Sequence, residues 1–213
     1  MQLPEIERKY VLNVYDEISR HFDDTRFCIW NSVRDFLSRN NGANLIGLDI
    51  GCGSGKNLKM GNNMIGIDNS EEMVNICLKK KYKALLGECN SLPFEDNSFD
   101  YSIAIAVFHH LSNENRRIKA LNEMIRILKK GGRGLITLWS VENQENEKKK
   151  RKFTQGDNYV KWTNRNDNDK LLWRYIYIYN EEMVYDLLKK ISNVNIVNIF
   201  NEHGNWIIEF IKN

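Results

Sequence analysis

Three glycines stand at alternate positions in residues 49–56, whose sequence is D-I-G-C-G-S-G-K. Glycine lacks a Cβ atom, so a loop of this kind can turn sharply and lets a ligand approach the backbone closely. The spacing differs from the G-x-G-x-x-G of dinucleotide-binding proteins, because the last glycine of that pattern would fall at Lys56. Two interpretations are left: a loop that binds some other ligand, and a tight strand–helix turn that binds none.

An acidic residue ends the next apolar run along the chain. Asp68 closes the run 64–68, at about the spacing expected of an acid that binds a ribose after a glycine loop. Its two carboxylate oxygens can accept hydrogen bonds from both ribose hydroxyls. A strand-end aspartate can instead cap the helix that follows, although Ser70 is available for that position.

Two further apolar runs end in polar residues. Glu88 ends the run 84–88, and His109 and His110 follow the run 99–107. A glycine loop, two strand-end acids and the end of a fourth strand, in this order, form one specific set. Together they favour a ligand site over an empty turn.

Segments with helical periodicity alternate with these apolar runs, and the helices they form must hold the strand ends in position. Strands that alternate with helices, each strand a near-continuous apolar run, predict an α/β fold: a doubly wound, mostly parallel seven-stranded sheet with helices on both faces. The expected strands are 45–49, 64–68, 84–88, 99–107, 134–139, 194–200 and 206–211. The expected helices are 5–37 with an interruption at 23–26, a short one after the glycine loop, 70–80, 118–130 and 181–190, and 173–179 is β-prone.

The composition is that of an ordinary globular chain. Of 213 residues 42% are hydrophobic and 28% charged, and the formal net charge of +3 neither indicates nor excludes nucleic acid. No apolar run approaches the roughly 20 residues of a membrane span, and the first residues do not resemble a secretory signal. The four cysteines, Cys28, Cys52, Cys77 and Cys89, lack metal-ligand spacing and are expected to be reduced. We expect the cytoplasm, with the nucleus as a further compartment, and no metal or membrane.

The loop pattern D-x-G-x-G-x-G resembles the first motif of class I methyltransferases, a Rossmann-like family that uses S-adenosylmethionine. The resemblance implies that Asp68 binds the ribose and that 87–94 holds the adenine, with Glu88 where aspartate is more usual. The methyl group is then expected near the end of the fourth strand. The cofactor-binding residues so implied are Asp49, Gly51, Cys52, Gly53, Gly55, Lys56, Asp68, Asn69, Glu88, Cys89 and Ala106.

Other short motifs point to an acceptor. They are D-T-R-F at 24–27 with Trp30, H-H-L-S at 109–112 with Arg116 and Arg117, L-W at 138–139 with Glu142, Y-V-K-W at 159–162 and R-Y-I-Y at 174–177. Together, over 15–206, they resemble the eukaryotic tRNA methyltransferases that esterify 5-carboxymethyluridine at the wobble position. The resemblance implies tRNA as substrate and a heterodimer with a small zinc-binding activator subunit, which covers an apolar sheet edge or face near the cofactor.

The implied acceptor is a carboxylate, which is already ionised at neutral pH and needs no general base. The site must hold one oxygen in line with the sulfonium methyl, and such positioning contributes roughly 7–11 kcal/mol. A guanidinium fork suits a carboxylate, and tryptophan rings can stack a flipped uridine. The candidate catalytic residues are Arg26, His109, His110, Arg116 and Arg117, and the candidate substrate-binding residues are Asp24, Trp30 and Trp139.

Each of these assignments has a structural alternative. Arg116 and Arg117 can form a solvated helix face, one of the two histidines can be structural, and Trp30 and Trp139 can belong to the core. The basic run 148–152 can be an ordinary soluble loop or, with lysines from 79 to 83, can meet a phosphate backbone.

Two other functions stay open on the sequence alone. A small-molecule methyltransferase acting on a quinone or phenol precursor fits the common His-His-Leu element, and a binding module without catalysis fits the fold. We expect one methyltransferase domain over 1–213: N-terminal helices in 1–42, the cofactor-binding core in 43–141, a mobile insertion in 142–170, and the substrate side with the closing strands in 171–213.

Overall fold

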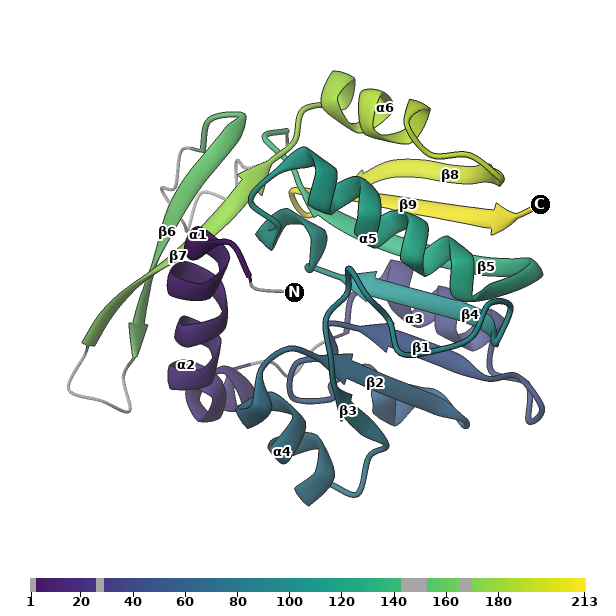
Figure 1. The fold of residues 1–213 in the computed structure, drawn as a ribbon, viewed down its shortest axis with the longest axis horizontal. Helices are drawn as coiled ribbons and strands as arrows, with labels where there is room; N and C mark the ends of the chain where they lie inside the picture. Colours follow the sequence, from purple (N-terminus) through teal and green to yellow (C-terminus); the bar gives the residue numbers. More distant parts are fainter. Residues whose placement is uncertain (1–2, 26–28, 143–152, 165–169) are drawn as a thin grey trace.

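The computed structural model describes residues 3–25, 29–142, 153–164 and 170–213. Within these ranges a seven-stranded sheet has the order β3-β2-β1-β4-β5-β9-β8 (Figure 1). Strands β1 to β5 are parallel, and β9 runs antiparallel to β5 and β8. The strands are β1 Gly47–Ile50, β2 Met64–Asp68, β3 Ala84–Leu86, β4 Phe99–Ile105, β5 Leu128–Trp139, β8 Val194–Glu202 and β9 Asn205–Lys212. The expected doubly wound, mostly parallel seven-stranded sheet is confirmed.

The helices begin with one continuous stretch, which we call the N-terminal helical segment. It comprises α1 (Glu5–Glu7), the π-helical η1 (Arg8–Leu12) and α2 (Asn13–Asp24). The others are α3 Asn31–Arg39, α4 Glu71–Lys79, α5 Glu114–Ile127 and α6 Glu181–Lys189, with 3₁₀ turns η2 Leu58–Met60 and η3 Phe108–His110. The predicted N-cap of α4 is confirmed, because the Ser70 hydroxyl accepts a hydrogen bond from the Met73 N–H at 3.2 Å.

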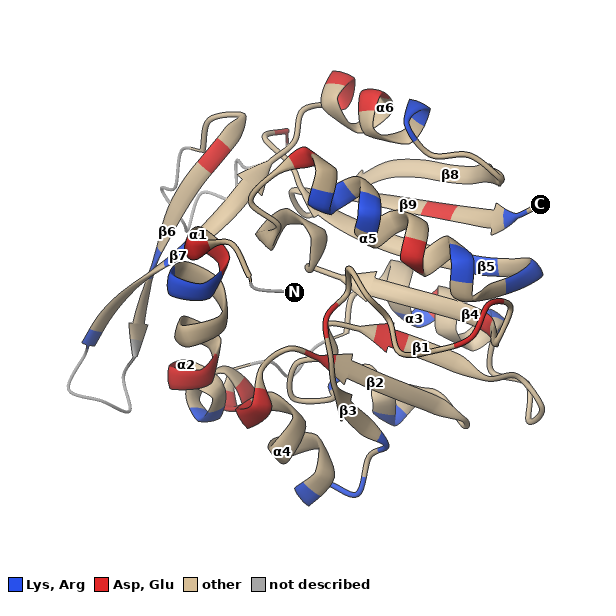
Figure 2. Cartoon of the chain, viewed as in Figure 1, with Lys and Arg blue, Asp and Glu red and all other residues tan. Residues whose placement is uncertain are grey.

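Two hydrophobic layers enclose the sheet. Leu48 and Ile136 pack in the layer that contains α5 and α6, whereas Ile103 and Leu135 pack in the layer that contains α3 and α4. Successive strand side chains point to opposite faces, so each apolar strand serves both layers. Charged residues accordingly concentrate on the helices and strand ends, and the central strands are mostly uncharged (Figure 2).

The order of the strands places a crevice at their carboxyl ends. Strand β1 pairs with β2 on one side and with β4 on the other. The chain therefore moves outward from β1 to β3 and then returns across the sheet to β4. In open α/β sheets, ligands bind at such a reversal point, outside the carboxyl ends of the strands.

Two boundaries differ from the sequence prediction. The short connection between β1 and β2 holds only the 3₁₀ turn η2, so the glycine loop does not lead into an α-helix. Helix α5 ends at Ile127 and β5 begins at Leu128, because Leu128 is fully buried and pairs with Phe99. Gly131, with a φ of 78°, lies inside the strand and not after the helix.

The range 142–170, expected as a mobile insertion, contains a strand that the sequence analysis did not predict. Strand β6 (Gly156–Asn164) pairs antiparallel with β7 (Lys170–Ile178) in a separate two-stranded sheet. This sheet stands beside the N-terminal helical segment (Figure 1). Val160 and Ile176 are buried there with Trp139 and Phe153 packed against them, so burial of one face explains why the hairpin forms.

Candidate functional site

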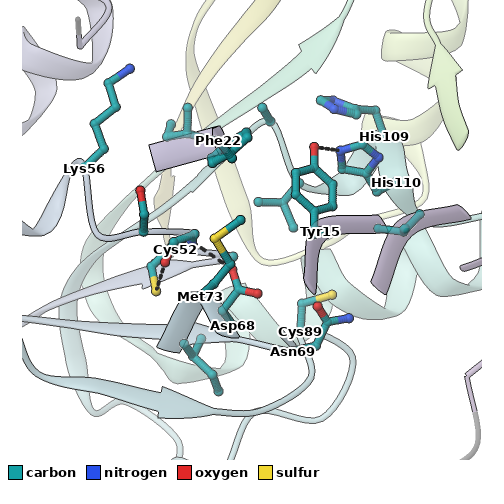
Figure 3. A pocket seen from close by; sticks show the side chains of 18 of the residues that line it. Tyr15, Phe22, Cys52, Lys56, Asp68, Asn69, Met73, Cys89, His109 and His110 are labelled. Atoms are coloured by element: carbon teal, nitrogen blue, oxygen red, sulfur yellow. Dashed lines mark hydrogen bonds between the residues drawn. The ribbon is translucent and has the colours of Figure 1, made fainter. Parts of the chain in front are cut away.

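A cavity of about 240 Å³ opens at the carboxyl ends of β1, β2 and β4. The glycine loop and the ends of β2 and β4 form its floor, and the N-terminal helical segment and β7 complete its walls. Figure 3 shows Asp68 and Cys52 on one side and Tyr15, His109 and His110 on another. We call these the loop side and the histidine side.

The glycine loop exposes its backbone to this cavity. Gly51 and Gly53 have φ values of 65° and 52°, which favour glycine. A Cβ on Gly51 would lie 2.5 Å from a methyl of Val107. A Cβ on Gly53 would meet only Phe22, at 3.6 Å, so the chain at Gly53 faces open space. The loop can therefore receive a ligand against its main chain.

Asp68 joins the loop to the end of β2. Its carboxylate accepts hydrogen bonds from the Gly53 N–H at 2.8 Å and the Ser70 N–H at 2.9 Å. Burial raises the pKa of Asp68, and these two amide donors act in the opposite direction. The side chain lines the cavity at the position that the sequence predicts for the ribose-binding acid.

Asp49 lies behind the loop and is completely buried. One carboxyl oxygen, Oδ2, accepts a long hydrogen bond of 3.4 Å from the Asn57 amide, and Oδ1 has no partner among the described residues. Burial raises the pKa of Asp49 to about 8. An acid left this short of partners fits a site that receives a cation, such as a sulfonium or an ammonium group. The loop, Asp68 and Asp49 therefore fit S-adenosylmethionine.

Arg116 forms the centre of an ion-pair triad beside the cavity, with one member, Glu88, in the cavity lining. Its guanidinium donates to both oxygens of Glu7 and of Glu88 at 2.8–3.0 Å. Glu7 also accepts from the N–H and the hydroxyl of Ser112. Arg116 does not line the cavity, so we revise its predicted role from carboxylate clamp to structural anchor.

Arg117 also points away from the cavity. Its guanidinium donates to the Leu111 carbonyl at 2.9 Å and lies 3.8 Å from the centre of the Tyr177 ring. It lines a separate small groove with Glu114 and Lys190. The predicted role of Arg117 as a clamp is therefore revised as well, because its guanidinium contacts the Leu111 carbonyl and the Tyr177 ring and does not line the cavity.

The two histidines occupy different positions on the histidine side. His110 Nδ1 lies 2.8 Å from the Tyr175 carbonyl, which can only accept, so Nδ1 carries the proton. His110 Nε2 then accepts from the Tyr15 hydroxyl at 2.9 Å (Figure 3). His109 packs against Trp139, and its Nδ1 has no partner among the described residues. Burial lowers the pKa of His110 to about 3 and that of His109 well below its ordinary value.

Most predicted cofactor residues line the cavity. They are Gly51, Cys52, Gly53, Lys56, Asp68, Asn69, Glu88, Cys89 and Ala106. Asp49 and Gly55 lie outside this lining. Trp30 and Trp139 line it as predicted for substrate contacts, whereas Asp24 does not, and Arg26 lies outside the described residues. Ala106, at the end of β4, has a φ of 60°, a strained backbone of the kind that concentrates at functional sites.

The sequence analysis missed several lining residues, and four of these are charged or aromatic side chains that reach the cavity from distant segments. Glu7, Tyr15 and Phe22 come from the N-terminal helical segment, and Arg174 comes from β7. Their spacings of eight and seven residues along one helical segment were a usable signal for the first three, because such spacings place them near one helix face. Arg174 belongs to a motif noted in the sequence, but only the packing of β7 assigns it to the cavity.

Comparison with known proteins agrees with this geometry. Residues 48–136 match the family model described as a methyltransferase domain. The tRNA (carboxymethyluridine(34)-5-O)-methyltransferase alkbh8 of Xenopus tropicalis is 32% identical over 95% of this chain and 41% of that protein. The enzyme of the same name from Arabidopsis thaliana is 44% identical over 67% of this chain and 35% of that protein. The chain thus spans less than half the length of these two relatives.

Solved structures share the fold. A chain in the complex between the Haloferax volcanii Trm112 methyltransferase activator and the putative methyltransferase has a TM-score of 0.65 at 15% identity, covering 96% of this chain and 98% of that chain. A SAM-dependent methyltransferase from Methanosarcina mazei has a TM-score of 0.65 at 19% identity, covering 86% of this chain and 98% of that chain. The class I methyltransferase fold is therefore established. No helix among the described residues is long and apolar enough to cross a membrane.

The anchoring role of Arg116 predicts a loss of stability. Arg116→Met leaves two carboxylates facing each other without a cation, so we expect the free energy of unfolding to fall by about 3 kcal/mol or more. Lys119→Met, at an exposed position on the same helix, should change it by less than about 0.5 kcal/mol. Urea unfolding measures both. An Arg116→Met protein of wild-type stability that had lost only its activity would contradict the revision.

Proposed function

We propose that the chain methylates the carboxylate of 5-carboxymethyluridine at the wobble position of tRNA, because it belongs to the family of tRNA (carboxymethyluridine(34)-5-O)-methyltransferases, whose Schizosaccharomyces pombe member is 39% identical over 74% of this chain and 69% of that protein. The similarity to the Xenopus tropicalis protein over 95% of the chain carries the proposal. The cavity at the carboxyl ends of β1, β2 and β4 supports it, since donor and acceptor must meet at one point. We place this activity in the cytoplasm, with the nucleus as a second compartment.

S-adenosylmethionine, when bound, supplies an electrophilic methyl carbon: a carboxylate oxygen forms the C–O bond while the C–S bond breaks and its electron pair leaves on sulfur. Asp68 and the amides around Gly53 would hold the ribose and the methionine part, and the segment at Glu88 and Cys89 would hold the adenine. No proton moves in this reaction, because an ordinary carboxylate is ionised at neutral pH.

The residues on the histidine side therefore orient the acceptor and exclude water. His110 has both ring nitrogens engaged and stays neutral, so it is not available as a base. Trp30 and Trp139 present aromatic surface on which a flipped uracil can stack, a contact worth about 1–3 kcal/mol per base. Close positioning of this kind is the main contribution that a site can make when the nucleophile needs no activation.

Methyl transfer to defined tRNAs tests the proposal. With a partner activator present, labelled methyl groups should appear in tRNA that carries 5-carboxymethyluridine and be released as methanol by mild base, which cleaves the ester. The same tRNA with unmodified uridine at the wobble position should incorporate no label. Equal labelling of both tRNAs, or of neither, would rule out this acceptor.

The protonation states of the site predict the pH dependence of the chemical step. With tRNA and donor both saturating, kcat should change by less than about twofold between pH 6 and 7, because the acceptor carboxylate and both histidines do not titrate there and Asp49, with a pKa of about 8, stays protonated over this range. A phenol acceptor, with a pKa near 10, should instead show kcat rising up to tenfold per pH unit unless a base assists. A steep rise with carboxymethyluridine tRNA would indicate a general base that the proposal lacks.

We also propose that a small zinc-binding activator subunit of the Trm112 type covers the β3 edge. In the described part of the chain, strand β3 pairs only with β2, and its outer side leaves backbone groups available for another strand. Leu85 and Leu86 on β3 and Leu78 on α4 are 45%, 57% and 52% exposed, an unusual amount of apolar surface beside the cofactor end of the sheet. The resemblance to a chain from an activator complex supports such a partner.

The edge assignment predicts the effect of a charge on β3. Leu86→Arg should abolish co-purification with the activator and keep the chain poorly soluble and nearly inactive, as we expect for the chain alone. Phe200→Arg on β8, at the opposite edge and 45% exposed, serves as the matched control and should co-purify normally. Vigorous turnover by the purified single chain, or loss of binding in the control only, would contradict this placement.

A further inference from the structure

Arg174 is a buried cation that has no acid to neutralise it among the described residues. It lies on β7, is 4% exposed and lines the cavity. Its Nη1 donates to the Tyr15 hydroxyl oxygen at 3.1 Å, and its buried Nε has no partner in the described part of the chain. An unpaired buried guanidinium costs free energy, so its presence at a cavity wall points to an anion that enters from outside.

Arg116 shows how this chain satisfies a structural arginine. That guanidinium is paired with Glu7 and Glu88 and does not line the cavity. Arg174 instead lies against aromatic rings, with its Cζ 4.6 Å from the centre of the Trp162 ring and 5.8 Å from that of Tyr15. Aromatic faces stabilise the cation in place while leaving its N–H groups uncommitted. The contrast distinguishes a structural arginine, Arg116, from Arg174, which is available to bind a ligand.

A chain of hydrogen bonds fixes the orientation of Arg174. The Tyr175 carbonyl accepts from His110 Nδ1–H, so His110 Nε2 must accept from the Tyr15 hydroxyl. The Tyr15 oxygen is then left with lone pairs that accept from Arg174. This chain of hydrogen bonds occupies the Nη1 side of the guanidinium and leaves its Nε without a partner among the described residues. Tyr15 and His110 act as positioning residues for Arg174.

On the basis of the proposed function, we propose that Arg174 binds the substrate carboxylate through its free Nε side and thereby selects a carboxymethyl over a neutral group. Arg174 contacts the histidine side, through Tyr15 and close to His109 and His110, and not Asp68 on the loop side. That location fits the acceptor anion better than the carboxylate of the methyl donor. One N–H donor group is enough to orient one oxygen while the second stays available as the nucleophile.

The neutral amide of the same shape gives a sharp test of selection. 5-Carbamoylmethyluridine replaces one carboxylate oxygen with an NH₂ group. This group can only donate hydrogen bonds and therefore cannot accept one from Arg174. With the activator subunit present, anticodon stem-loops with either nucleoside can be compared by direct binding without the donor and by methyl transfer. We expect the wild-type protein to prefer the acid by at least about tenfold.

Arg174→Gln should remove this preference. Binding of the acid and the amide should become equal within about twofold, and kcat/KM for the acid should fall by about 100-fold. The dissociation constant for S-adenosylmethionine, measured by calorimetry, should stay within about twofold of wild type. Arg133→Gln is the matched control, because Arg133 pairs with Glu209 far from the cavity lining, and it should change none of these values.

Tyr15→Phe provides a second variant that keeps the ring and the fold. It removes the group that orients Arg174, so the acid preference should fall by about three- to tenfold with donor binding unchanged. Should Arg174→Gln fail to fold, the acid-to-amide ratio of Tyr15→Phe decides whether Arg174 binds the substrate carboxylate. An unchanged acid-to-amide ratio in the variants would overturn the proposal, as would a loss of donor binding with that ratio intact.

The same experiment separates this inference from the proposed function. Wild-type protein that prefers the acid in an Arg174-dependent way but transfers no methyl group would overturn the proposed function and support the carboxylate site. Methyl transfer to the acid with no dependence on Arg174 would support the function and overturn the site.

Discussion

The ion pair between Glu7 and Arg116 holds the N-terminal helical segment over the carboxyl ends of the strands. Residues 7–22 contribute Glu7, Val11, Tyr15 and Phe22 to the cavity wall, so the cavity exists only while this segment is docked. An isolated helix of this length is marginal in water, and its tertiary contacts must keep it in place. Arg116 supplies one of them by sharing its charge between Glu7 and Glu88, which also ties the segment to the end of β3.

The cavity has two sides of opposite electrical character. On the loop side, Asp68 and, behind it, the buried Asp49 suit a cationic donor, because burial raises the pKa of both carboxyl groups and a nearby cation favours their charged forms. On the histidine side, two neutral imidazoles and Arg174, which has no acidic partner among the described residues, suit an anion. A sulfonium methyl and a carboxylate oxygen would therefore be drawn to adjacent places, and their encounter needs no proton transfer.

The strand ends were predictable because they depend on local sequence. Apolar runs of five to nine residues that end at Asp49 or Asp68, or shortly before His109, show in the sequence where strands stop, and parallel topology then brings these ends together. The Ser70 cap was equally local. Strand β6 was missed because its polar and aromatic residues gain their β-structure from pairing with β7, and Leu128 became a strand residue only through contact with Phe99.

The arginines show which properties follow from the sequence and which follow from the tertiary structure. In the sequence Arg116, Arg117 and Arg174 are alike, each beside polar or aromatic neighbours that suit several roles. The sequence by itself determined the fold class, the glycine loop and the acids around it, since these follow from periodicity and spacing. Only the tertiary structure decided which guanidinium is paired and which is free, because Glu7 and Tyr15 approach from segments more than a hundred residues away. A charge takes its role from its neighbours in space, and those are set by packing.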